Sequence, residues 1–253
     1  MKRRILTSIS VLGILALALF FGQACGPAFE LPSDGLTSLR SSYLTDNEKA
    51  ACASAMRRGE SGFQNLGDLV SYLNEQPKPV QIHCVVANLP RPLKIQAGVS
   101  AASAQPSAGS SNPRILIRVG SLILAIVPDG TAKNTLEVGA LKTASQATRA
   151  EFIFPISDET IQANIGLDHI RTSGLGTSTT CGFCHRGETP ESGEAGITGA
   201  FRSEIVRFAE SERRRVASVK QLADTCVTNK DQSDRCLLLR SLMEGGTPME
   251  IEF

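Results

Sequence analysis

The sequence has no tryptophan, two tyrosines and three histidines among 253 residues, and aromatic residues make up 5% of the chain. A folded core must therefore come mostly from aliphatic side chains. Neither sign of charge dominates, because 26 Lys and Arg residues face 25 Asp and Glu residues. A strongly basic surface is thus missing, and we expect no nucleic-acid partner.

The chain also has no apolar run of bilayer length, since a spanning helix needs roughly 20 residues. Its densest apolar run, Val11–Phe21, follows the basic start Met1–Arg4 and precedes Gly22-Gln23-Ala24-Cys25. This order is typical of a secretory signal, here residues 1–24. The alternative is an uncleaved anchor helix over residues 5–21.

The end of this signal resembles the lipobox of bacterial lipoproteins, in which a small residue precedes a cysteine that becomes lipidated. Ala24 and Cys25 match that pattern, whereas Gly22 stands where an aliphatic residue is usual. The resemblance implies a lipid on Cys25 and a periplasm-facing, membrane-anchored protein. Residues 26–42 are rich in Gly, Pro, Ser and Leu without a clear period, so residues 25–42 are predicted to be a tether. Gly26 is not the Asp that retains lipoproteins at the inner membrane, so the outer membrane is favoured. An ordinary cleaved signal is the alternative.

The seven cysteines can be sorted by this compartment, since export permits disulfides. Cys25 is assigned to the lipid, and Cys181 and Cys184 belong to a separate motif. Pairing the remaining four by nearness in sequence predicts the disulfides Cys52–Cys84 and Cys226–Cys236. Other pairings of these four are possible in principle.

Cys181-Gly182-Phe183-Cys184-His185 is a C-x-x-C-H motif, the attachment signature of c-type haem. Two thiols at this spacing reach the two vinyl groups on one porphyrin edge, and His185 is then placed to bind the iron. On these residues the C-terminal part resembles a monohaem cytochrome c domain. The resemblance implies one covalent haem c, held by Cys181, Cys184 and His185, and a redox partner protein.

Three other readings of the motif stay open. The two cysteines are also compatible with a redox-active or structural disulfide, although no βαβ pattern surrounds them. Zinc is a third possibility, but its fourth ligand would have to come from Cys226 or Cys236.

The sixth iron ligand is suggested by the resemblance alone. Met249, in a Gly-Gly-Thr-Pro-Met segment, suits the methionine that follows the haem motif in that family. His169 is a further candidate, and an iron without a second protein ligand is another. Met243 and His83 are better explained as a core residue and a strand residue.

The predicted fold class is α+β, with N-terminal helices, a small antiparallel sheet or barrel, and then an all-α cytochrome c-like domain. The domains are a signal (1–24), a tether (25–42), an α+β domain (43–156) and a helical haem domain (157–253). Helices are expected over 45–57, 64–75, 158–165, 200–219, 219–227 and 233–244, and strands over 79–86, 93–96, 114–119, 121–127, 136–141 and 150–156.

The leading function is electron transfer by one covalent haem, so we expect an electron carrier more than an enzyme. A non-catalytic envelope lipoprotein, with Cys181 and Cys184 as a disulfide, is the first alternative. A haem-based sensor or peroxidase-like enzyme with an open iron site is the second.

Overall fold

The computed structural model describes residues 42–53, 62–100, 105–107, 109–158, 160–162, 164–171, 179–191 and 199–253. The predicted signal, Cys25, nearly all of the tether and the end of the first predicted helix lie outside these residues. Residues 41–253 form one compact unit. Within the described part, no helix has the length and apolar character needed to cross a bilayer.

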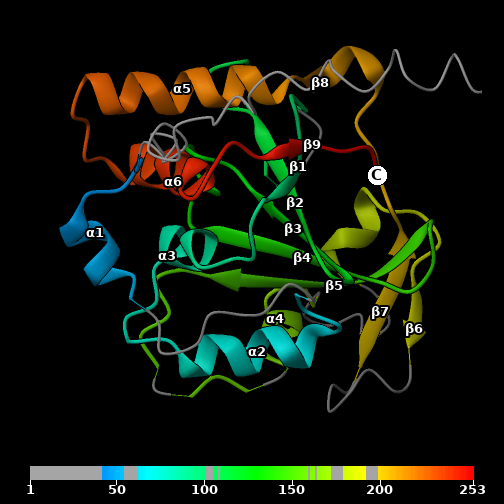
Figure 1. The fold of residues 1–253 in the computed structure, drawn as a ribbon. Coiled ribbons are helices and arrows are strands. Elements are labelled where there is room, and N and C mark those ends of the chain that lie inside the picture. The colour runs from blue at the N-terminus through cyan, green and yellow to red at the C-terminus, as the bar shows by residue number, and fades with distance from the viewer. Residues whose placement is uncertain are drawn as a thin grey trace, which may run out of the picture. The chain divides into compact units, whose positions relative to one another are not determined.

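Helices open the described chain, a run of strands follows, and shorter helices and strands are interspersed in the C-terminal part (Figure 1). The helices are α1 (Asp46–Ala51), α2 (Leu66–Glu75), α3 (Ile82–Ala87), α4 (Ile165–Asp168), α5 (Val216–Thr228) and α6 (Asp234–Met243), with the 3₁₀ helices η3 (Thr180–Phe183) and η4 (Glu210–Glu212). The strands are β1 (Lys94–Gly98), β2 (Arg114–Val119), β3 (Leu122–Ile126), β4 (Thr135–Leu141), β5 (Gln146–Ile153), β6 (Thr189–Glu191), β7 (Ala200–Glu204), β8 (Arg213–Arg214) and β9 (Met249–Glu250).

All nine described strands belong to one mixed sheet in the order β6-β7-β5-β4-β3-β2-β1-β8, and β9 also pairs with β1. Strands β1 to β5 form an antiparallel meander, while β9 runs parallel to β1. The turn between β2 and β3 uses Gly120 with φ 62°, a conformation that glycine adopts without a steric penalty. The predicted hairpin over 114–127 is therefore present.

The helices and one face of the sheet form the main core. This core combines aliphatic residues from α2, α3, α5 and α6 with alternate residues of β1 to β5, such as Ile115, Leu124 and Leu136. The side chains between them point to the opposite face, where Leu116, Ile123 and Ala125 form a separate small cluster with Phe208. The sheet thus has two apolar faces, and only the first is covered by helices.

The prediction of an all-α domain after residue 157 is wrong. Strands β6 to β9 all come from that half and join the sheet, with β7 pairing with β5 and β8 with β1. The helix predicted over 200–219 is a strand at Ala200–Glu204, followed by η4 and β8, and α5 begins only at Val216. Edge pairing satisfies the main chain of this segment, and it outweighs the helical spacing of Ile205 and Phe208.

Two further local predictions need correction. The strand expected over 79–86 is reduced to a single bridge between Val80 and Ile156, and helix α3 follows, so His83 and Cys84 are helical. Periodicity does not distinguish a short buried helix from a strand when the run is uniformly apolar. The helix expected over 158–165 instead spans Ile165–Asp168.

Two cysteine pairs lie at disulfide distance. Cys52 and Cys84 join the end of α1 to α3 with a Cα–Cα distance of 4.8 Å. Cys226 and Cys236 join α5 to α6 with a Cα–Cα distance of 5.4 Å. Both are the pairs proposed from nearness in sequence, and they leave Cys181 and Cys184 as the free thiols of the described chain.

An ion pair fixes the short helix α1 on α6. Both carboxylate oxygens of Glu48 accept from Arg240, at 2.7 and 3.0 Å, and the two side chains are 13% and 5% exposed. Thr45 caps α1 by accepting from the Glu48 amide, while Glu48 accepts from the Thr45 amide. A six-residue helix is too short to be stable alone, so these contacts hold it in place.

Glu48→Gln should lower the free energy of unfolding by about 3 kcal/mol, because it leaves the Arg240 guanidinium buried without a counter-charge. Chemical denaturation of the oxidised protein measures the change. The matched control is Lys133→Gln, which breaks the exposed pair with Asp234 (3.2 Å) and should cost less than about 1 kcal/mol. Equal effects of the two substitutions would show that the Glu48–Arg240 pair has no special role.

Candidate functional site

The C-x-x-C-H motif occupies η3 and the turn that follows it. Thr179 caps η3 by accepting from the amide of Cys181 at 3.2 Å. The Glu188 carboxylate in turn accepts from the amide of Thr179 at 2.8 Å and from its hydroxyl. Glu188 therefore anchors the start of the motif and takes a positioning role.

One turn of chain brings the three motif side chains together. The amides of Cys184 and His185 both donate to the carbonyl of Cys181, at 3.1 and 2.8 Å. Gly182 allows close packing here, because a Cβ at this position would lie 2.9 Å from a carboxylate oxygen of Glu188. Cys181 is partly buried against the main core, whereas Cys184 is exposed.

The imidazole of His185 is held through Nδ1. This atom lies 2.8 Å from the carbonyl oxygen of Glu204 and 3.1 Å from an Arg149 nitrogen, which itself donates to the same carbonyl at 2.8 Å. A carbonyl only accepts, so Nδ1 carries the proton and both side chains donate to Glu204. Nε2 then has a lone pair, and it makes no hydrogen bond to any described residue.

This arrangement is the one that metal-binding histidines adopt, with one ring nitrogen donating to a backbone carbonyl and the other presented as the ligand. Burial, followed by the positive charge of Arg149, lowers the pKa of His185 to about 4. The imidazole is therefore neutral at neutral pH, the form that binds a metal. Burial also raises the pKa of the Cys181 thiol to about 11, so this thiol is protonated at neutral pH.

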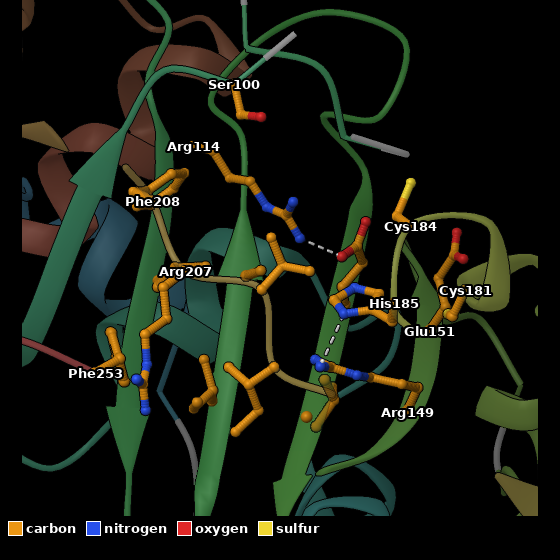
Figure 2. Close-up of a pocket in the computed structure, with 18 of the residues that line it drawn as sticks. Ser100, Arg114, Arg149, Glu151, Cys181, Cys184, His185, Arg207, Phe208 and Phe253 are labelled. Carbon is orange, nitrogen blue, oxygen red and sulfur yellow. Dashed lines mark hydrogen bonds and ion pairs between the residues drawn. The ribbon is translucent and has the colours of Figure 1, made fainter. Parts of the chain in front are cut away.

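A cavity opens beside the motif on the face of the sheet that no described α-helix covers (Figure 2). Cys181, Cys184 and His185 all line it, and its volume is about 110 Å³. This volume is below the roughly 300 Å³ at which small-molecule and cofactor sites begin, so a large planar ligand would also have to occupy the open mouth.

The floor of the cavity follows the pleat of the sheet. Leu116, Ala125, Glu137 and Glu151 are cross-strand neighbours in successive strands from β2 to β5. Glu137 forms a partly buried ion pair with Arg114, drawn as a dashed line in Figure 2. Burial, together with the nearby Glu137, raises the pKa of Glu151.

The far wall is aromatic. A Cβ on Gly98 would lie 2.5 Å from the Phe208 ring, so the ring packs directly on the main chain of β1. Phe253 also lines the cavity, and the exposed side chains of Val206 and Arg207 lie at its rim. The cavity thus combines an apolar wall with charged groups of both signs, namely Arg114, Arg149 and Arg207 and the carboxylates of Glu137 and Glu151.

The structure does not bring the predicted sixth ligands to this cavity. Met249 lies on β9 beside β1, with 50% of its surface exposed. Met243 is fully buried in the core on α6, as expected from the sequence. His169 is exposed at the end of α4, and His83 lies on α3 next to a disulfide.

The sequence reasoning missed the residues around His185. Glu137 and Glu151 stand between apolar residues of predicted strands, Arg114 begins a third predicted strand, and Arg149 directly precedes the strand that holds Glu151. Charged residues recurring on the same face of neighbouring strands indicate a lined cavity. No sequence pattern pointed to the Glu204 carbonyl as a partner of His185, because its segment was predicted to be helical.

Comparison with protein families, curated proteins and solved structures finds no match to this chain.

Arg149→Met should raise the pKa of His185 from about 4 towards the 6.5 of a free imidazole, because it removes a positive charge beside the ring. The imidazole resonances of haem-free protein, followed by NMR against pH, measure this shift. Arg207→Met removes an arginine from the same cavity that is not among the causes of the His185 shift, and should leave the pKa unchanged.

The sign of the pH effect on stability follows. The pKa of His185 is lower in the folded chain than in the unfolded chain, so stability should fall as pH drops from about 6.5 to 4. That fall should be smaller in Arg149→Met. A His185 pKa unaffected by Arg149→Met would contradict the proposed contact.

Proposed function

We propose that this chain is an envelope electron-transfer protein that carries one haem c, bonded to Cys181 and Cys184 and ligated by His185. The observation that supports this proposal most strongly concerns His185. It follows Cys184 and lines the cavity together with both thiols, and its Nδ1 donates a hydrogen bond to the Glu204 carbonyl. The ring is thereby neutral and Nε2 keeps a free lone pair, as a metal-binding histidine requires. When bound, the haem supplies a one-electron redox centre.

The proposal needs the motif and the cavity but not a cytochrome c fold. Attachment chemistry depends on two thiols and a histidine within one turn of chain, which η3 and its C-terminal turn supply. Cys181 and Cys184 are both free thiols, as thioether formation requires. Cys184 is exposed, so a group bonded to its sulfur is accessible to a redox partner at the surface.

Export supports the same proposal. Haem c is attached outside the cytoplasm, and residues 1–24 carry the pattern of a secretory signal. We extend the proposal to a periplasm-facing protein whose lipid anchor is Cys25, at the outer membrane by preference.

The full chain, expressed in a bacterium with c-type haem maturation, should gain the mass of one haem. The pigment should survive acid–acetone extraction and denaturing electrophoresis, because thioether bonds do not dissociate. Cys181→Ser with Cys184→Ser should abolish attachment, and His185→Ala should lose the spectrum of the histidine-ligated iron.

Two controls separate attachment from general folding. Cys226→Ser with Cys236→Ser removes a cysteine pair far from the cavity and should retain the pigment. A chain that starts after residue 24 and stays in the cytoplasm should remain colourless. A colourless full chain of unmodified mass, from cells with working maturation, would falsify the haem proposal.

A second function, a sensor or peroxidase-like enzyme with an open iron site, is favoured by one observation. Of the three histidines in the chain, His185 alone lines the cavity, and the described methionines Met243 and Met249 lie elsewhere. The other ligand types usual for haem iron are cysteine and tyrosine, and both described tyrosines, Tyr43 and Tyr72, are buried in the main core.

Carbon monoxide distinguishes the two functions. With an open sixth position, the reduced holoprotein should bind it at once and shift its visible spectrum. Met249→Ala should leave that spectrum unchanged, because Met249 lies outside the cavity. No reaction with carbon monoxide would show a second protein ligand and favour the electron carrier.

A further inference from the structure

A second cluster of ligand-type side chains lies in the helical layer, away from the cavity. It consists of Cys52 at the end of α1 with His83 and Cys84 on α3. The two sulfurs and a ring nitrogen of His83 all lie within 4.8 Å of one another. In the structure the two sulfurs are bonded to each other.

The two segments are held together by more than the disulfide. The side chain of Asn88, just after α3, donates to the carbonyl of Cys52 at 2.7 Å. The Glu48–Arg240 pair independently fixes α1 on α6. Cleavage of the S–S bond would therefore leave Cys52 and Cys84 facing each other with His83 beside them.

Once reduced, the cluster would offer two thiolates and one imidazole. Soft sulfur ligands select copper(I) or zinc among the common metals. Structural zinc sites are almost always four-coordinate, and this cluster provides three ligands, whereas copper(I) accepts three. Burial lowers the pKa of His83, which keeps its imidazole in the neutral form.

A route for the metal is also visible. Cys52 is buried, but His83 is half-buried and lines a surface hollow together with Lys133 and Asp234. Cys84 is half-buried as well, and His83 is the cluster member that lines the hollow. The hollow carries one charge of each sign, because Asp234 pairs with Lys133 at 3.2 Å.

We propose that Cys52, His83 and Cys84 form a redox-gated copper(I) site. An external dithiol reduces the Cys52–Cys84 bond by thiol–disulfide exchange and itself becomes a disulfide, which leaves two protein thiols. Copper(I) then replaces one proton on each thiol and takes His83 as its third ligand, so two protons are released for each metal bound. The oxidised pair has no thiolate and binds no copper.

The test uses the full mature chain with Cys181→Ser and Cys184→Ser, so that the thiols of the other site take no part. After reduction by dithiothreitol and its removal under nitrogen, copper(I) is titrated against a chromophoric chelator. The reduced chain should bind one copper(I) in competition with the chelator, and the oxidised chain should bind none. Cys84→Ser should abolish this binding, and His83→Ala should weaken it at least tenfold.

Cys226→Ser with Cys236→Ser is the matched control, because it removes the other disulfide and should keep copper binding at Cys52 and Cys84. Thiol alkylation mapped by mass spectrometry gives an independent result on the chain that retains both pairs. Copper(I) should protect Cys52 and Cys84 but leave Cys226 and Cys236 reactive.

Equal copper affinity in His83→Ala, or protection of Cys226 and Cys236 instead, would overturn the proposal. So would a reduced chain that binds no copper(I) while its circular dichroism still shows the native fold. None of these results depends on haem, because the two cysteines of the C-x-x-C-H motif are absent from the chain tested for affinity.

Discussion

The candidate site depends on the pairing of β5 with β7. Three residue pairs join these strands, and Glu204 is the last residue of β7. Its carbonyl accepts from Arg149 on β5 and from His185 after η3, while its amide donates to Arg186. One peptide at the end of a short strand therefore fixes the strand, the arginine and the histidine relative to one another. Without this pairing, His185 and Arg149 would lose the carbonyl that they share.

The cavity exists because the sheet has two apolar faces and helices on only one of them. The second face is partly covered by the segment around Phe208 and by Phe253. Burying Arg114, Glu137 and Arg149 there costs solvation free energy, which the Arg114–Glu137 pair and the Glu204 carbonyl partly offset. Such a cluster of buried charges beside a neutral histidine is expected at a functional site more than in a structural core.

The sequence predicted the secondary structure correctly where the local pattern of residues agrees with the tertiary environment. The hairpin around Gly120, the capping box at Thr45 and the paired helices near the C-terminus are all present near their predicted bounds. The segments 200–219 and 79–86 were wrongly predicted. In the first, an open strand edge on β5 decides the conformation, and this edge is invisible in the local sequence. In the second, a uniformly apolar run fits either conformation.

The site was only partly predictable for the same reason. The C-x-x-C-H motif identifies its own three side chains by spacing alone, but Arg149 and the Glu204 carbonyl reach His185 through strand pairing across the fold. Met249 has the residue type and the sequence context expected of an iron ligand. The structure nevertheless places it on β9 beside β1, outside the cavity.

Strand β9 has a consequence for how the fold is reached. The Met249 amide donates to the carbonyl of Leu93, which directly precedes β1, and the Ile251 amide donates to the carbonyl of Ile95 within β1. During synthesis from the N-terminus, β1 is made long before the residues that complete its outer edge. The meander of β1 to β5 can form early from local contacts, whereas the closing strand must wait for almost the whole chain. Until then the β1 edge has unpaired main-chain groups, the state in which sheet proteins are most prone to associate with one another.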